Sequence, residues 1–259
     1  MASKSPQTIA SDLIKRVNDL LQAGNFLDGN SFNVKSLLQE ADKLIKIDPT
    51  KGHVAKAAIY QISNSELKMR DHFRIARQYT NNSDISVYSD NAIGLANLGY
   101  FSEAQDLFTQ FDLINYLTIQ NIERTFEVGY QILAFSHLES WIDKAKKLAL
   151  PITENNMVLT SKTVAILNKN NISDKLLSQY ADIAGEVLRE NKLMMQDKTP
   201  NFEVAEEENG WFPATIFITF KVNVDHLTAA RLYKELTKRL IAKFEDIPDA
   251  IHISIESSL

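Results

Sequence analysis

Apolar residues recur at intervals of three and four over most of the chain, and this spacing predicts helices. The few glycines and prolines, 8 and 6 in number, fall between the apolar runs and separate one expected helix from the next. The pattern predicts about ten helices arranged as five antiparallel pairs. Their expected ranges are 8–23, 34–47, 51–62, 67–80, 85–98, 102–114, 119–134, 138–149, 154–168 and 173–192.

In the last quarter of the chain the apolar spacing changes to alternation. Every second residue of the range 214–224 is apolar on one side, which is typical of a half-buried strand. Shorter strands are expected at 201–205 and 251–255, and a helix at 225–244 lies between the last two strands. This order predicts an antiparallel hairpin followed by a right-handed parallel crossover.

The helix expected at 225–244 carries an apolar stripe that we expect to pack on this sheet, with helix 173–192 beside it. The opposite face of the sheet keeps Phe217, with Trp211 or Phe212 nearby. We expect that face to dock on the other helices or on a second copy, which would form a homodimer through the C-terminal sheet. The stripe consists of Leu227, Ala230, Leu236, Leu240, Ile241 and Phe244.

One helix pair, between residues 85 and 118, has small and aromatic residues at spacings that resemble the tetratricopeptide repeat. Alanines stand where two helices must approach closely, and Gly99 stands in the tight turn between them. The likeness extends in outline over residues 35–150 and implies a solenoid of stacked helix hairpins. A non-repeating helical bundle is the alternative. The matching residues are Tyr88, Ala92, Leu95, Gly99, Phe101, Ala104, Phe108 and Phe111.

The expected fold is therefore mainly helical. A solenoid resembling tetratricopeptide repeats occupies residues 1–170, or continues to 192, and a small α/β unit with the order strand, strand, helix, strand occupies residues 171–259. The length of 259 residues allows one large domain or two ordinary ones.

Composition narrows the function classes. The chain has no cysteine, which excludes disulfides, thiolate metal sites and cysteine nucleophiles. A formal charge of −5 disfavours binding of the whole protein to nucleic acid or to anionic membranes. No apolar run approaches the roughly 20 residues that cross a bilayer, and the first residues lack the apolar core of a secretory signal. We expect a cytoplasmic protein with no membrane partner.

No motif of catalysis or cofactor binding is present. The glycines do not form a phosphate-binding loop, and no serine stands in a Gly-x-Ser-x-Gly elbow. The 5 histidines are scattered, without a pair at helical spacing. We therefore expect no catalytic residue, no metal and no cofactor. His252, on the outer face of the last strand near Lys221 or Thr219, is the one histidine to test first as a site for a small acid.

Without such motifs, the expected function rests on the shape of the helical array, because stacked helix hairpins present a concave surface to a partner. The expected function is a non-enzymatic protein–protein interaction module that binds a protein or peptide in this groove. Asparagines would hold the backbone of the bound segment, Arg124 a carboxylate and Asp90 a basic side chain. The expected binding residues are Lys56, Tyr60, Asn64, Ser89, Asp90, Ile93, Asn97, Asn121, Arg124, Thr125 and Val128.

Two other functions stay open, and both use the C-terminal unit. A nucleic-acid-binding regulator would use the basic stripe of helix 225–244, formed by Lys234, Lys238, Arg239 and Lys243. A small-ligand sensor would use the sheet around His252. The acidic run at 206–208 is expected to be a solvated loop.

Overall fold

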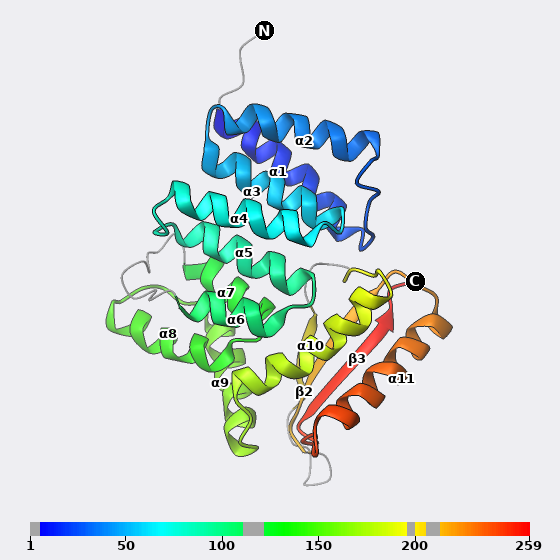
Figure 1. Cartoon of the computed structure of the whole chain (residues 1–259). Helices are drawn as coiled ribbons and strands as arrows, with labels where there is room; N and C mark the ends of the chain where they lie inside the picture. The colour runs from blue at the N-terminus through cyan, green and yellow to red at the C-terminus, as the bar shows by residue number, and fades with distance from the viewer. Residues whose placement is uncertain (1–5, 111–121, 196–199, 206–212) are drawn as a thin grey trace.

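The computed structural model describes residues 6–110, 122–195, 200–205 and 213–259, with side chains from residue 11 onward. The described chain is mainly helical and ends in one small three-stranded sheet (Figure 1). The elements are α1 (Pro6–Gln22), α2 (Phe32–Ile45), α3 (Pro49–Ile62), α4 (Glu66–Tyr79), α5 (Ile85–Asn97), α6 (Phe101–Thr109), α7 (Ile122–Gln131), α8 (Phe135–Lys147), α9 (Glu154–Lys169), α10 (Asp174–Glu190), β1 (Asn201–Ala205), β2 (Thr215–Val222), α11 (His226–Lys243) and β3 (Ile251–Ser257).

The sequence prediction of helices up to residue 192, followed by a small α/β unit, is confirmed at this level of detail. Local caps explain many of the starting points: Asp48 accepts a hydrogen bond from the backbone N–H of Lys51, and Ser173 accepts one from Leu176. Asp225 does the same for α11. Parts of the expected ranges 102–114 and 119–134 lie outside the described residues.

The odd-numbered helices α1, α3, α5 and α7 contact one another in succession. Of the even-numbered helices, α2 and α4 pack on α3, α6 packs on α5, and α8 packs on α7. Figure 1 shows α1–α5 as successive layers above α6–α9. The odd helices therefore form one side of the array made by the first eight helices.

Helix α10 does not continue this order but lies across α6 and α8. Its closest approach is between two backbones: a Cβ on Gly185 would lie 2.1 Å from the carbonyl oxygen of Gly99. Gly99 also has φ +77°, a conformation that L side chains rarely adopt. Only glycine fits at this crossing, so both glycines are needed for α10 to reach α5 and α6.

Side chains of α10 cap the helices that it crosses. The residues that precede α6 and α8, Tyr100 and Ala134, make no side-chain cap of their own. Instead Asp182 accepts hydrogen bonds from the backbone N–H groups of Phe101 and Ser102, at 2.6 and 3.1 Å. Asp174 accepts from the N–H groups at the start of α8, at 2.9 Å for Ser136. Two helix starts are therefore satisfied from a third helix.

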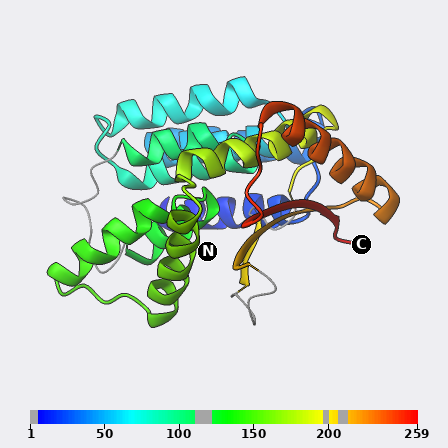
Figure 2. The ribbon, with the colours of Figure 1, turned by 90° about the horizontal axis from the view of Figure 1, so that it is seen from below.

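The sheet has the order β1-β2-β3, with β1 and β2 antiparallel and β2 and β3 parallel. This topology was predicted from the sequence and is confirmed. Alternate residues of β2, from Ile216 to Val222, are buried. Both α10 and α11 contact β3, and Figure 2 shows them on the same side of the sheet. Aromatic contacts join this face to the helices, with the rings of Phe101 and Phe220 5.6 Å apart and those of Phe135 and Phe202 4.6 Å apart.

The predicted apolar stripe of α11 was partly wrong. Leu227 and Ile241 are 85 % and 66 % exposed, and Ala230 is exposed as well. The stripe that contacts the sheet lies on a different side of the helix from the predicted one. Its buried members are Ala229, Leu232, Leu236 and Leu240. The inner face, not the face that carries Phe217, packs against the helices; Trp211 and Phe212 lie outside the described residues.

The buried side chains form two clusters. The larger runs from Ala57 in α3 to Ile255 in β3, so the sheet and the helices from α3 onward share one core. The smaller fills the space between α1, α2 and α3. Met194, which follows α10, is 2 % exposed and belongs to this N-terminal cluster. The segment after α10 therefore returns to the beginning of the chain.

Candidate functional site

A trough crosses the side of the molecule formed by the odd helices α1, α3, α5 and α7. The hollow at its centre has a volume of about 270 Å³. A second hollow of about 400 Å³ lies towards the N-terminal ends of α3 and α5 and shares Ile14, Val54 and Asp90 with the first. The first hollow is lined by Ile14, Asn18, Leu21, Val54, Ala58, Gln61, Phe73, Asp90, Ile93, Asn97, Arg124, Glu127 and Gln131.

The odd helices contribute to the trough at matching positions. Each presents three residues separated by three or four positions, which lie on one face of a helix. Across the helices these residues form three rows. The first row is Ile14, Val54, Asp90 and Arg124; the middle row is Asn18, Ala58, Ile93 and Glu127; the third is Leu21, Gln61, Asn97 and Gln131.

An ion-pair cluster occupies the α5–α7 end of the trough. Arg124 donates to Asp90 at 2.7 Å and to Glu127 at 3.2 Å. Burial raises the pKa of Asp90 above its usual value, an effect that Arg124 opposes and that the carboxylates of Asp84 and Glu127 reinforce. Because two carboxylates share one guanidinium, a negative charge is left uncompensated at this end of the trough.

Three side-chain amides follow one another in the third row, and we call Gln61, Asn97 and Gln131 the amide row. Gln61 and Asn97 are 3 % and 5 % exposed. Among the described residues, Gln61 Nε2, Asn97 Oδ1 and Gln131 Oε1 have no hydrogen-bond partner. A buried polar atom without a partner costs about 1–3 kcal/mol. The amide row is therefore an unfavourable arrangement unless something else supplies the missing bonds.

Four of the residues expected from the sequence lie together in the trough: Asp90, Ile93, Asn97 and Arg124. Three others are buried in the core, namely Ser89, Thr125 and Val128. Each of these three directly precedes or follows a lining residue, and one position turns a side chain by about 100° around a helix. Asn121 lies outside the described residues.

The three expected residues of α3 and its C-terminal turn do not line the trough. Lys56 forms an ion pair with Asp42 of α2 at 2.6 Å, and Tyr60 stacks on His72 of α4. Asn64 follows the helix in a left-handed conformation, with φ 51°. The face of α3 that was predicted to bind is the one that packs against α2 and α4.

The lining residues of α1 and α3, Phe73 of α4 and two lining residues of α7 were not predicted from the sequence. A signal for some of them was available, because Gln61 and Gln131 lie 36 residues before and 34 residues after Asn97. Transferring the position of Asn97 to the neighbouring pairs would have found the amide row. Position alone does not show that the amides lack partners.

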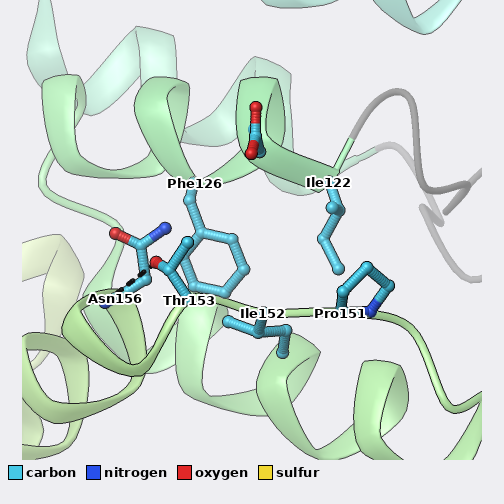
Figure 3. A pocket seen from close by; sticks show the side chains of 7 residues that line it. Ile122, Phe126, Pro151, Ile152, Thr153 and Asn156 are labelled. Atoms are coloured by element: carbon cyan, nitrogen blue, oxygen red, sulfur yellow. Dashed lines mark hydrogen bonds between the residues drawn. The ribbon is translucent and has the colours of Figure 1, made fainter.

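A small apolar pocket of about 190 Å³ lies on the other flank of α7 (Figure 3). Ile122 and Phe126 of α7 face Pro151 and Ile152 of the segment before α9. Thr153 accepts a hydrogen bond from the backbone N–H of Asn156 and so starts α9 beside the pocket. The chemistry of the pocket suits a short apolar side chain.

Two histidines that are 19 residues apart meet between α3 and α4. Their Nδ1 atoms are 2.8 Å apart, and the rings of Tyr79, His53, His72 and Tyr60 stack in succession. Burial, then the neighbouring His53 and Lys56, lowers the pKa of His72 to about 4, and burial lowers that of His53. The described residues contain no group of three side chains suited to hold a metal. The pair is therefore a neutral hydrogen-bonded contact at neutral pH.

Some of the groups named for the two other functions have partners within the C-terminal unit. Arg239, one member of the expected basic stripe, is paired with Glu190 at 2.6 Å and with Glu235 at 2.9 Å. His252 lies near the rings of Phe217 and Tyr233. Thr219 accepts a hydrogen bond from Ser254 at 3.1 Å. These contacts involve Arg239, His252 and Thr219, whereas Lys234, Lys238 and Lys243 of the basic stripe are exposed.

None of the described helices combines the length and the apolar character needed to cross a membrane. Comparison with protein-family models, with curated proteins and with solved structures finds no match to this chain.

Proposed function

We propose that this chain is a non-enzymatic protein-interaction module that binds a segment of a partner protein in the trough. In this proposal α1–α8 form a solenoid that resembles tetratricopeptide repeats, and the trough is its concave face. The succession of contacts between the odd helices supports the proposal. So does the recurrence of lining positions, which lie 40 residues apart between α1 and α3, 35 or 36 between α3 and α5, and 34 between α5 and α7.

The observation that carries the proposal is the arrangement of lining side chains in three rows across four helices. The rows cross four helices, which pack about 8–10 Å apart, and they offer groups at regular intervals. Amides, aliphatic groups and an ion pair complement the repeated amides and varied side chains of a polypeptide. A partner segment would contact several helices at once.

The C-terminal unit has a supporting role in this proposal. Arg189 of α10 donates to the carbonyl oxygens of Leu98 and Gly99, at 2.9 and 2.5 Å, where α5 ends. With Asp182 and Asp174, it ties α10 to α5, α6 and α8. The unit would then hold α5 and α7 in the register that the rows require.

The test places a larger side chain in the trough at a half-buried position. Ala58→Arg would place a long side chain in the middle row, and Ala242→Arg on the exposed side of α11 is the matched control. Partner proteins captured from the source cell by the unmodified chain are identified by mass spectrometry and then measured with both variants. The proposal expects Ala58→Arg alone to abolish capture; a partner that both variants retain would contradict it.

A further inference from the structure

The amide row shows what kind of segment the trough would hold, provided that the proposed function is correct. Gln61 Nε2 is a donor, whereas Asn97 Oδ1 and Gln131 Oε1 are acceptors, and none of the three has a partner among the described residues. These are the complements of a backbone carbonyl and of backbone N–H groups. The terminal torsions of Asn and Gln are broad, so a small rotation turns the atoms towards a ligand.

The spacing of the amide row selects the conformation of the ligand. Helices pack about 8–10 Å apart, and the row has one amide on each of α3, α5 and α7. An extended chain advances about 3.1–3.3 Å per residue and therefore covers that distance in about three residues. A helical ligand uses its own backbone groups internally and would leave the amide row unsatisfied.

The charge of the trough selects a side chain. Asp90 and Glu127 share the single guanidinium of Arg124 and flank Ile93, one helical turn from Asn97. Asp84 adds a further carboxylate at the N-terminal end of α5. A cationic side chain at this point would compensate the excess negative charge, and an acidic one would be repelled.

We propose that the occupant of the trough is an extended polypeptide segment whose main chain is held by the amide row at every third residue. A Lys or Arg of that segment lies against Asp90 and Glu127. The unliganded chain carries the unfavourable amide row, and the bound segment supplies its missing hydrogen bonds.

The experiment uses the full chain and a displayed random library of linear peptides about 12 residues long, which spans the three amides with residues to spare. Peptides are selected on the unmodified chain, and those blocked by Ala58→Arg but not by Ala242→Arg are kept. Affinities of these peptides are then measured by fluorescence anisotropy for Gln61→Met and Asn97→Leu. Both variants keep the approximate shape of the side chain and remove its hydrogen-bonding groups.

The proposal expects the selected peptides to share a Lys or Arg at one position and to lose about threefold to tenfold in affinity with each amide variant. The melting temperatures of the two variants should stay level or rise, because each removes a buried atom that has no partner. A purely structural role for the amides would lower them instead. Replacing the shared Lys or Arg by Ala should weaken binding to the unmodified chain and have little effect with Asp90→Asn/Glu127→Gln.

Two outcomes would overturn the inference, and they are distinguishable. Peptides that depend on Ala58 but lack a basic residue, or bind the amide variants as tightly as the unmodified chain, contradict the inference and leave the proposed function standing. A library that yields no peptide sensitive to Ala58→Arg contradicts both.

Discussion

Buried polar groups differ in their hydrogen bonding between two sides of α5–α8, the side that faces α10 and the side that carries the trough. Facing α10, Asp174, Asp182 and Arg189 satisfy the ends of other helices, and Gln105 donates to three carbonyl oxygens at 2.9–3.1 Å. In the trough, one buried polar atom of each amide in the amide row has no partner among the described residues, although Gln131 Nε2 donates to Glu127. Amide side chains therefore stabilise the fold on one side, whereas on the other they include buried atoms without a partner among the described residues.

The largest effect is expected where α10 crosses the turn between α5 and α6. Gly185→Ala would place a Cβ 2.1 Å from the carbonyl oxygen of Gly99, and neither backbone can yield without moving a helix. We expect a loss of about 3 kcal/mol in the free energy of unfolding, measured by urea denaturation. Gly29→Ala is the control, because its Cβ would lie 3.7 Å from Ser63 Cβ in ordinary contact. Equal stability of the two variants would show that the crossing is not tight.

Replacing a glutamine by methionine on each side tests whether the buried amides differ in their contribution to stability. Gln105→Met would leave the carbonyl oxygens of Ile132 and Leu133 without this donor, so we expect a loss of about 2 kcal/mol. Gln61→Met removes an atom that has no partner and is expected to cost nothing or to stabilise by up to about 1 kcal/mol. Thermal unfolding followed by circular dichroism gives both values. A similar loss in the two variants would remove the contrast between the two sides.

The cap that α10 provides to α6 should have a smaller effect. Asp182→Ala removes the acceptor for the N–H groups of Phe101 and Ser102, and we expect a loss of about 1–2 kcal/mol. Asp143→Ala on the exposed side of α8 serves as the control and should change stability by less than about 0.5 kcal/mol. Hydrogen exchange at the start of α6 should increase in the first variant alone. Unchanged protection there would mean that α6 does not need the cap.

Acid should loosen the end of the molecule that α10 does not cross. The pKa of His72 is lowered to about 4 in the folded chain, so below about pH 6.5 the unfolded chain takes up a proton that the folded chain resists. Stability is then retained above pH 6.5 and falls, by on the order of 1 kcal/mol, as the pH approaches 5. Hydrogen exchange should rise in α3 and α4 before it rises in α6 and α8. His72→Gln should remove most of this dependence.

Much of the architecture could be predicted because its signals are local. Apolar periodicity located the helices, and alternation in β2 with a helix before β3 was enough for the sheet order. The faces of α3 and α11 were predicted less well, since a shift of one or two positions turns a helix face away from its target. Lys56 and Leu227 show this directly: the first pairs with α2, and the second is exposed.

The candidate site could be predicted only where the repeat fixed the register. Asp90, Ile93, Asn97 and Arg124 were found because the pair 85–118 set the positions of α5 and α7. The lack of partners for the amide row depends on groups far apart in the sequence and leaves no local signal. The caps from α10 leave only an indirect one, which is the missing cap residue at Tyr100 and Ala134.

The position of Met194 bears on how the chain is made. Its side chain closes the N-terminal cluster around Leu13, Ala41 and Ile59, although it is synthesised long after them. While the ribosome is still adding residues, the N-terminal cluster therefore lacks one of its buried side chains. The first helices to emerge gain their last core contact only after α10 has been synthesised.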